Sequence, residues 1–104
     1  MNRDELISIM FDTNAYEEER QEAAGYLTNF PDLTSLEALS KIAKNKKESF
    51  YVRAKAGESL GLIMLTIGKL EEQYINEIEE DAKDEVMAVF RDNQPTWYER
   101  MKKR

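Results

Sequence analysis

Apolar residues recur at three- and four-residue spacing through most of this chain, and this pattern predicts a series of short helices. The first is expected over residues 4–11 and the second over residues 15–29. In the second helix an apolar side opposes a side that carries glutamates. That apolar side holds Tyr16, Ala23, Ala24, Leu27 and Phe30. Pro31 ends the helix, because proline disfavours the helical conformation of the residue before it.

A third helix is predicted to run to Lys44, after Thr34 or Ser35 as its N-cap. Glu37 lies three residues after Thr34, as a capping box requires. The inward side of this helix would carry Leu36, Leu39, Ile42 and Ala43.

The fourth predicted helix, about residues 49–67, is the longest and most apolar, so we expect it to be the buried spine of the fold. Gly57 and Gly61 each cost roughly 1 kcal/mol of helix propensity relative to alanine. We therefore expect one of them to allow the close approach of a neighbouring helix. Gly68 is expected to end the helix as a C-terminal cap.

Two shorter apolar runs follow, at residues 70–78 and 82–91, and they predict a third, degraded pair of helices. Pro95 suits the first turn of a last helix over residues 96–102, which ends in a basic tail. Terminal units of repeat proteins are usually atypical, because one of their sides faces water.

The chain also repeats itself, and this is its most informative feature. The pairs Leu6 and Leu39, Ile9 and Ile42, Arg20 and Arg53, Ala23 and Ala56, and Leu27 and Leu60 all lie 33 positions apart. Such a period predicts stacked helical hairpins, because a single two-helix unit cannot bury its apolar face alone. The predicted fold is all-α: one domain, residues 1–104, of about three antiparallel hairpins over residues 3–30, 34–68 and 70–93, with a C-terminal cap over 95–104.

Composition removes most enzyme chemistries. The chain has no cysteine and no histidine, so thiolate nucleophiles, catalytic triads, imidazole bases and the usual zinc sites are excluded. No phosphate-binding glycine loop or calcium loop is present, and we expect a non-enzyme without metal or cofactor. A carboxylate-based enzyme would need converging carboxylates in a pocket, which the pattern does not predict.

Charge and hydropathy indicate the kind of partner. The chain carries 21 acidic and 15 basic side chains, a net charge of −6, which disfavours direct binding to nucleic acid and favours a basic protein. Solubility alone is an alternative explanation of this charge. The first residues do not resemble a leader, and no run approaches the roughly 20 apolar residues of a membrane span. We expect a cytoplasmic protein.

Residues 51–61, with the sequence YVRAKAGESLG, resemble the second helix of HEAT-like repeats. Glu19-Arg20, Ala23-Ala24 and Leu27 are similar to an earlier copy, and the third copy departs from the pattern with Lys83 in place of the arginine. The resemblance implies an α-solenoid in which Arg20 and Arg53 are buried and bond the turn before their helices. Asp12 and Asn45 are the candidate partners. A guanidinium held ready for a phosphate is the functional alternative.

In size, helical class and acidity the chain also resembles bacterial immunity proteins of contact-dependent growth inhibition, although it carries no diagnostic motif. That resemblance implies a cytoplasmic antidote, monomeric in a 1:1 complex, that binds and neutralises a basic toxin such as a nuclease by covering its active site. The alternative is a HEAT-like adaptor or regulatory module that binds a protein unrelated to toxins.

Helical phase indicates where a partner would bind. The second helices of stacked hairpins would line one surface, with Glu18, Glu22, Tyr51, Glu58, Asp81 and Glu85 facing outward. A dense acidic block adds Glu71, Glu72, Glu77 and Asp84. Trp97 and Tyr98 either cover the end of the stack or serve as interface anchors. For any single glutamate, a solvated surface position is the preferred explanation.

Overall fold

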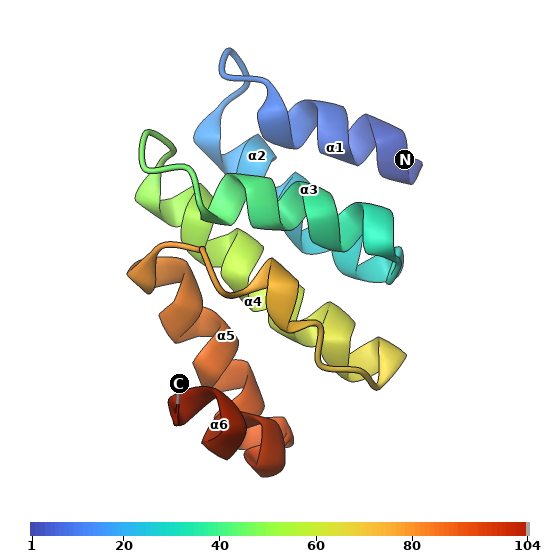
Figure 1. The fold of residues 1–104 in the computed structure, drawn as a ribbon. Helices are drawn as coiled ribbons and strands as arrows, with labels where there is room; N and C mark the ends of the chain where they lie inside the picture. The colour runs from blue at the N-terminus through green and yellow to red at the C-terminus, as the bar shows by residue number, and fades with distance from the viewer. Residues whose placement is uncertain (104) are drawn as a thin grey trace.

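Residues 1–103 of the protein are described by a computed structural model and form an all-helical fold (Figure 1). Six α-helices follow in order: α1 (Arg3–Phe11), α2 (Glu17–Tyr26), α3 (Leu33–Ala43), α4 (Phe50–Ile67), α5 (Glu80–Asn93) and α6 (Pro95–Lys102). Two 3₁₀ turns, Leu27–Asn29 and Glu72–Tyr74, join them. Helix α1 packs on α2 and α3, both of these pack on α4, α4 packs on α5, and α6 closes the far end against α5.

The longest helix, α4, is the buried spine that the sequence predicts. Val52, Ala56, Leu60, Ile63 and Met64 are all fully buried between α2, α3 and α5. Its most extensive packing is with α5.

Both glycines inside α4 face α5, and this explains why they are tolerated in a helix. A Cβ atom on Gly57 would lie 2.2 Å from the backbone carbonyl oxygen of Ala82, and one on Gly61 would lie 3.0 Å from the side chain of Val89. Gly68 adopts φ = 72°, the left-handed conformation of a helix C-cap, and its N–H donates to the carbonyls of Met64 and Leu65. The predicted close approach and the predicted cap are confirmed.

The N-terminal ends of α2 and α3 differ from the prediction. Helix α2 begins at Glu17 after Tyr16, whose side chain is 76% exposed rather than inward. Helix α3 is capped by Asp32, which accepts a hydrogen bond of 2.8 Å from the Ser35 N–H, so the capping box of Thr34 does not form. Asp32 is the better cap because its carboxylate also pairs with Arg3 at 2.9 Å.

The segment between α4 and α5 is not the predicted helix. It holds a single 3₁₀ turn, Glu72–Tyr74, and buries Ile75 and Ile78 against the core. The Glu79 N–H donates to the carbonyl of Ala43 at 3.0 Å and fixes the segment against the end of α3. Like-charged neighbours weaken a continuous helix here, and burial of two isoleucines with one tertiary backbone bond stabilises an irregular path instead.

The last helix begins at Pro95, as predicted, and covers the end of α5. Trp97 meets Phe90 edge to face, with the ring centroids 5.3 Å apart, and Met101 is buried. Helix α6 therefore closes the apolar end of the core.

Candidate protein-binding face

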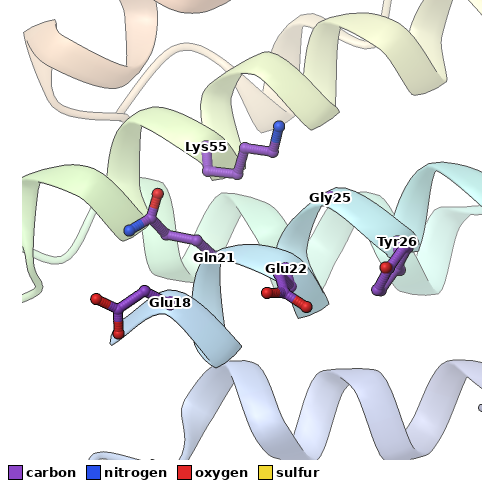
Figure 2. A pocket seen from close by; sticks show the side chains of 6 residues that line it. All are labelled: Glu18, Gln21, Glu22, Gly25, Tyr26 and Lys55. Carbon is purple, nitrogen blue, oxygen red and sulfur yellow. The ribbon is translucent and has the colours of Figure 1, made fainter. Parts of the chain in front are cut away.

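Helices α2, α4 and α5 form a hollowed face on which several of the predicted binding residues meet. One hollow of about 480 Å³ lies between α2 and α4 (Figure 2). A second, of about 200 Å³, continues it toward α5, and the two share Gln21 and Lys55. We call their combined lining the acidic groove: Glu18, Gln21, Glu22, Gly25, Tyr26, Tyr51, Ala54, Lys55, Glu58 and Glu85.

The groove carries four carboxylates and one ammonium group. Glu18 and Glu22 are exposed on α2, while Glu58 on α4 and Glu85 on α5 are half-buried. Within the described residues, the one ion pair of the groove joins Lys55 Nζ and Glu58 Oε1 at 2.8 Å. Opposite charge from a partner would therefore be attracted along the length of the groove.

Two exposed tyrosines lie along the same groove. Tyr51 is 60% exposed and meets the exposed Phe50 ring edge to face, with centroids 5.3 Å apart. Tyr26, 55% exposed, was not among the predicted binding residues. The sequence could have indicated it, because Tyr26 lies four residues after Glu22 on the same helix and residues four apart share a helix face. Large exposed aromatic rings suit the desolvated centre of a protein interface.

Gln21 and Gly25 were also missed by the sequence analysis. Both lie on the side of α2 that faces Lys55 (Figure 2). Nothing in the residue types of these two positions distinguishes them from ordinary helix positions, so only the packing of α4 beside α2 could identify them.

The acidic block of residues 71–85 is exposed only in part. Glu71 is buried, pairs with Lys69 at 3.2 Å and accepts a hydrogen bond from Gln73, and these contacts lower the pKa of its carboxyl, with the Gln73 bond the largest cause. Glu72 pairs with Arg100 at 2.8 Å. The exposed members are Glu77, Glu80 and Asp84.

Asp81 does not face outward as predicted. Its side chain is only 17% exposed and binds the guanidinium of Arg53. The hydrogen bonds from Arg53 hold the pKa of this carboxyl below its ordinary value. Asp81 is therefore a structural residue of the α4 and α5 contact.

Trp97 and Tyr98 lie on α6, outside the acidic groove. Both are half-buried, and Lys102 Nζ lies 5.2 Å from the centroid of the Tyr98 ring. This placement agrees with the covering role, and the interface-anchor role remains a prediction.

Arg20 is held inside the fold by partners other than Asp12. Its Nε donates to the carbonyl of Met10 at 2.9 Å, and its Nη2 pairs with Glu48 Oε2 at 2.5 Å. Both side chains of this pair are 8% exposed. The bond to Met10 at the end of α1 fits the predicted role, but the expected carboxylate was wrong.

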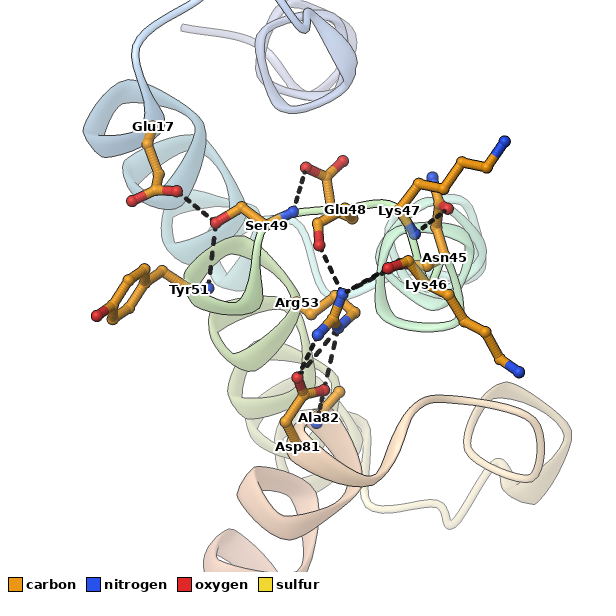
Figure 3. Close-up of polar contacts among 10 residues, drawn as sticks. All are labelled: Glu17, Asn45, Lys46, Lys47, Glu48, Ser49, Tyr51, Arg53, Asp81 and Ala82. Atoms are coloured by element: carbon orange, nitrogen blue, oxygen red, sulfur yellow. Dashed lines mark hydrogen bonds and ion pairs between the residues drawn. The ribbon is translucent and has the colours of Figure 1, made fainter.

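Arg53 makes the matching contacts one repeat later (Figure 3). Its Nη1 donates to the carbonyl oxygen of Glu48 at 2.5 Å and, at longer distance, to those of Lys46 and Asn45, while Nε and Nη2 bind both oxygens of Asp81. Asn45 thus contributes its backbone rather than its side chain. A guanidinium so fully engaged is not available for a phosphate.

The carboxylate partners recur with the same period as the arginines. Glu48 and Asp81 lie 33 positions apart, as Arg20 and Arg53 do. This recurrence was present in the sequence and would have identified the correct partners. The first pair ties α2 to the turn before α4, and the second ties α4 to the first turn of α5.

Positive charge gathers away from the groove. Lys41, Lys44, Lys46 and Lys47 lie exposed on α3 and the turn after it. Figure 3 shows Tyr51 pointing to one side of the molecule, while Lys46 and Lys47 project from the other. A basic partner would be attracted to the groove rather than to this lysine-bearing turn.

Comparison of the chain with models of known protein families, with curated proteins and with solved structures found no match. In the described part of the chain, His, Cys, Asp and Glu side chains form no group of three that could hold a metal ion. Every helix within residues 1–103 is too short or too polar to cross a bilayer.

Proposed function

We propose that this protein is an immunity protein that binds a basic toxin domain, such as a nuclease, through the acidic groove and covers its active site. One observation carries the proposal: Glu18, Glu22, Glu58 and Glu85 line the groove from three helices together with two exposed tyrosines, and the lysines of α3 lie elsewhere. The toxin assignment itself rests on the resemblance in size, helical class and charge.

The arrangement suits inhibition of a nucleic-acid enzyme for a physical reason. A nuclease presents basic residues that bind the phosphates of its substrate, and carboxylates of an inhibitor can bind at the same positions. Charge would accelerate encounter and orient the partner, while Tyr26 and Tyr51 would provide the desolvated contacts that slow dissociation. A stable interface buries about 800 Å² on each partner, so the contact would extend beyond the groove to rings such as Phe50.

We also propose that the fold is a HEAT-like stack of helical hairpins. The support is the period of 33 residues, shared by core positions and by the two arginine pairs that link successive second helices. In such a stack the irregular segment 69–79 would stand in place of the first helix of the last hairpin.

The experiment is a pull-down from the native organism with three tagged baits followed by mass spectrometry. The baits are the natural protein, a groove variant (Glu18→Gln, Glu22→Gln, Glu85→Gln) and a block variant (Glu77→Gln, Glu80→Gln, Asp84→Asn). Both variants remove three negative charges, so a difference between them reports position rather than net charge. Circular dichroism verifies that all three are folded.

A basic toxin fragment that binds the natural protein and the block variant, and is lost from the groove variant, supports the proposal. Loss from the block variant alone moves the site to residues 77–84 and refutes the groove. Stoichiometric recovery of a housekeeping complex instead of a toxin favours the adaptor function. Inhibition of the purified toxin, and protection of growth on co-expression, then test neutralisation directly.

A further inference from the structure

Lys55 is the one cationic side chain that lines the acidic groove, and it lies across the backbone of α2. A Cβ atom placed on Gly25 would be 2.9 Å from Lys55 Cε and 3.7 Å from Lys55 Nζ. The aliphatic stem therefore occupies space that any side chain at position 25 would fill. Figure 2 shows Lys55 extending from α4 above α2, whereas the side chains of Glu22 and Tyr26 project from the side of α2 away from Lys55.

The seat that Lys55 occupies has the features of a site for a basic side chain. Its floor is the bare backbone at Gly25, and the carboxylates of Glu18, Glu22 and Glu58 line the two adjoining hollows around it. A planar guanidinium can pair with a carboxylate through two parallel hydrogen bonds, which a compact ammonium cannot do.

Lys55 is only weakly retained there. Its side chain is 40% exposed, and its partner Glu58 is 38% exposed and three residues away on the same helix. Exposed pairs of this kind contribute about 0.2–1 kcal/mol. A competing cation attached to a larger interface can therefore displace it.

We propose that Lys55 is a placeholder, and that an arginine side chain of the basic partner displaces it and occupies the seat over Gly25. This inference rests on the proposed function, because it specifies how the groove receives its partner. Lys55 then lowers the affinity of the groove for any cationic surface until it moves, and it favours partners that place an arginine at this point.

The test is an NMR titration of the ¹⁵N-labelled protein with an acetylated, amidated hexa-arginine peptide at fixed low ionic strength. The variants are Lys55→Ala, Gly25→Ala, their combination and the control Lys41→Ala. Lys41 also pairs with a glutamate on its own helix, Glu37 at 3.6 Å, but on α3. The control therefore removes one positive charge of the same kind away from the groove.

Removal of Lys55 is expected to tighten peptide binding about threefold, because a unit charge about 6 Å away in water interacts by roughly 0.7 kcal/mol. The Lys41→Ala protein should bind as the natural protein does. Adding Gly25→Ala to Lys55→Ala should reverse the gain, since a methyl group then fills the floor of the seat. Gly25→Ala should not unfold α2, because its nearest neighbour is a flexible lysine stem and alanine favours a helix.

The inference is overturned if Lys55→Ala binds no more tightly than Lys41→Ala, if Gly25→Ala leaves the gain intact, or if the peptide shifts resonances outside the groove only. Each result is independent of the pull-down. A toxin captured through the groove together with an unchanged Lys55→Ala affinity would remove the placeholder and leave the proposed function standing. The expected peptide results without a captured toxin would leave the role of Lys55 standing and remove the proposed toxin function.

Discussion

Substitution of Gly57 by alanine tests the central contact of the fold, the crossing of α4 and α5. The added Cβ would lie 2.2 Å from the carbonyl oxygen of Ala82 and within 3 Å of two further backbone atoms of that residue. Ordinary contact begins near 3.4 Å. The two helices must therefore separate by about 1 Å, because helix backbone cannot rotate away as a side chain can.

The expected cost follows from two opposing terms. Overpacking of this kind costs roughly 3 kcal/mol, and replacing glycine by alanine inside a helix returns about 1 kcal/mol. The free energy of unfolding should fall by about 2 kcal/mol, which lowers Tm by roughly 10 °C for a domain of this size. Asp81 is the neighbour of Ala82, so separation also strains its pair with Arg53.

The measurement is urea unfolding at 25 °C followed by circular dichroism, with Gly61→Ala as the matched control. Gly61 lies one turn further along α4, and its added Cβ would meet only the side chain of Val89, at 3.0–3.3 Å. Small shifts of Val89 can relieve that contact, so this variant should stay within about 1 kcal/mol of the natural protein. Equal stabilities of Gly57→Ala and Gly61→Ala would refute the reasoning.

Three further predictions concern single contacts. Asp81→Asn should lower the free energy of unfolding at pH 7 by about 2 kcal/mol. Arg53 lowers the pKa of Asp81 below the ordinary 3.8, so the ionised carboxylate contributes its full stabilisation above that pH and loses it as pH falls through the lower folded pKa. The free energy of unfolding should therefore fall less steeply with acid in the variant than in the natural protein. Gly68→Ala should cost about 1 kcal/mol by urea unfolding, since φ = 72° strains a residue with a Cβ; no loss would contradict the assigned cap. Trp97→Ala should cost about 3 kcal/mol and expose Phe90, detectable as lower Tm with increased binding of a hydrophobic dye; unchanged Tm would exclude a covering role for α6.

Much of the fold could be predicted because its signals are local. The apolar spacing of residues 50–67 indicates a helix buried on several sides, and α4 is that helix. Gly68 and Pro95 mark boundaries through backbone chemistry that no tertiary contact is needed to explain. The helix predicted from the same spacing over residues 70–78 was wrong, because burial of Ile75 and Ile78 by an irregular segment produces a similar pattern.

The binding face was predictable only in part. Glu18, Glu22, Tyr51, Glu58 and Glu85 meet at one groove because α2 packs beside α4 and α4 packs beside α5. Asp81 carries the same charge and a similar phase, yet it is used to hold Arg53. A carboxylate that binds a partner and one that pairs internally are chemically identical in the sequence.

The sequence by itself determined the helical class, the period of 33 residues, the buried spine and the acidic character, because each depends on residue type and spacing along one helix. Only the tertiary structure decided which carboxylates pair with Arg20 and Arg53, the path of residues 69–79, and the groove in which Lys55 lies over Gly25. These features depend on distances between helices. Such distances are set by the packing of the whole core, to which every buried side chain contributes.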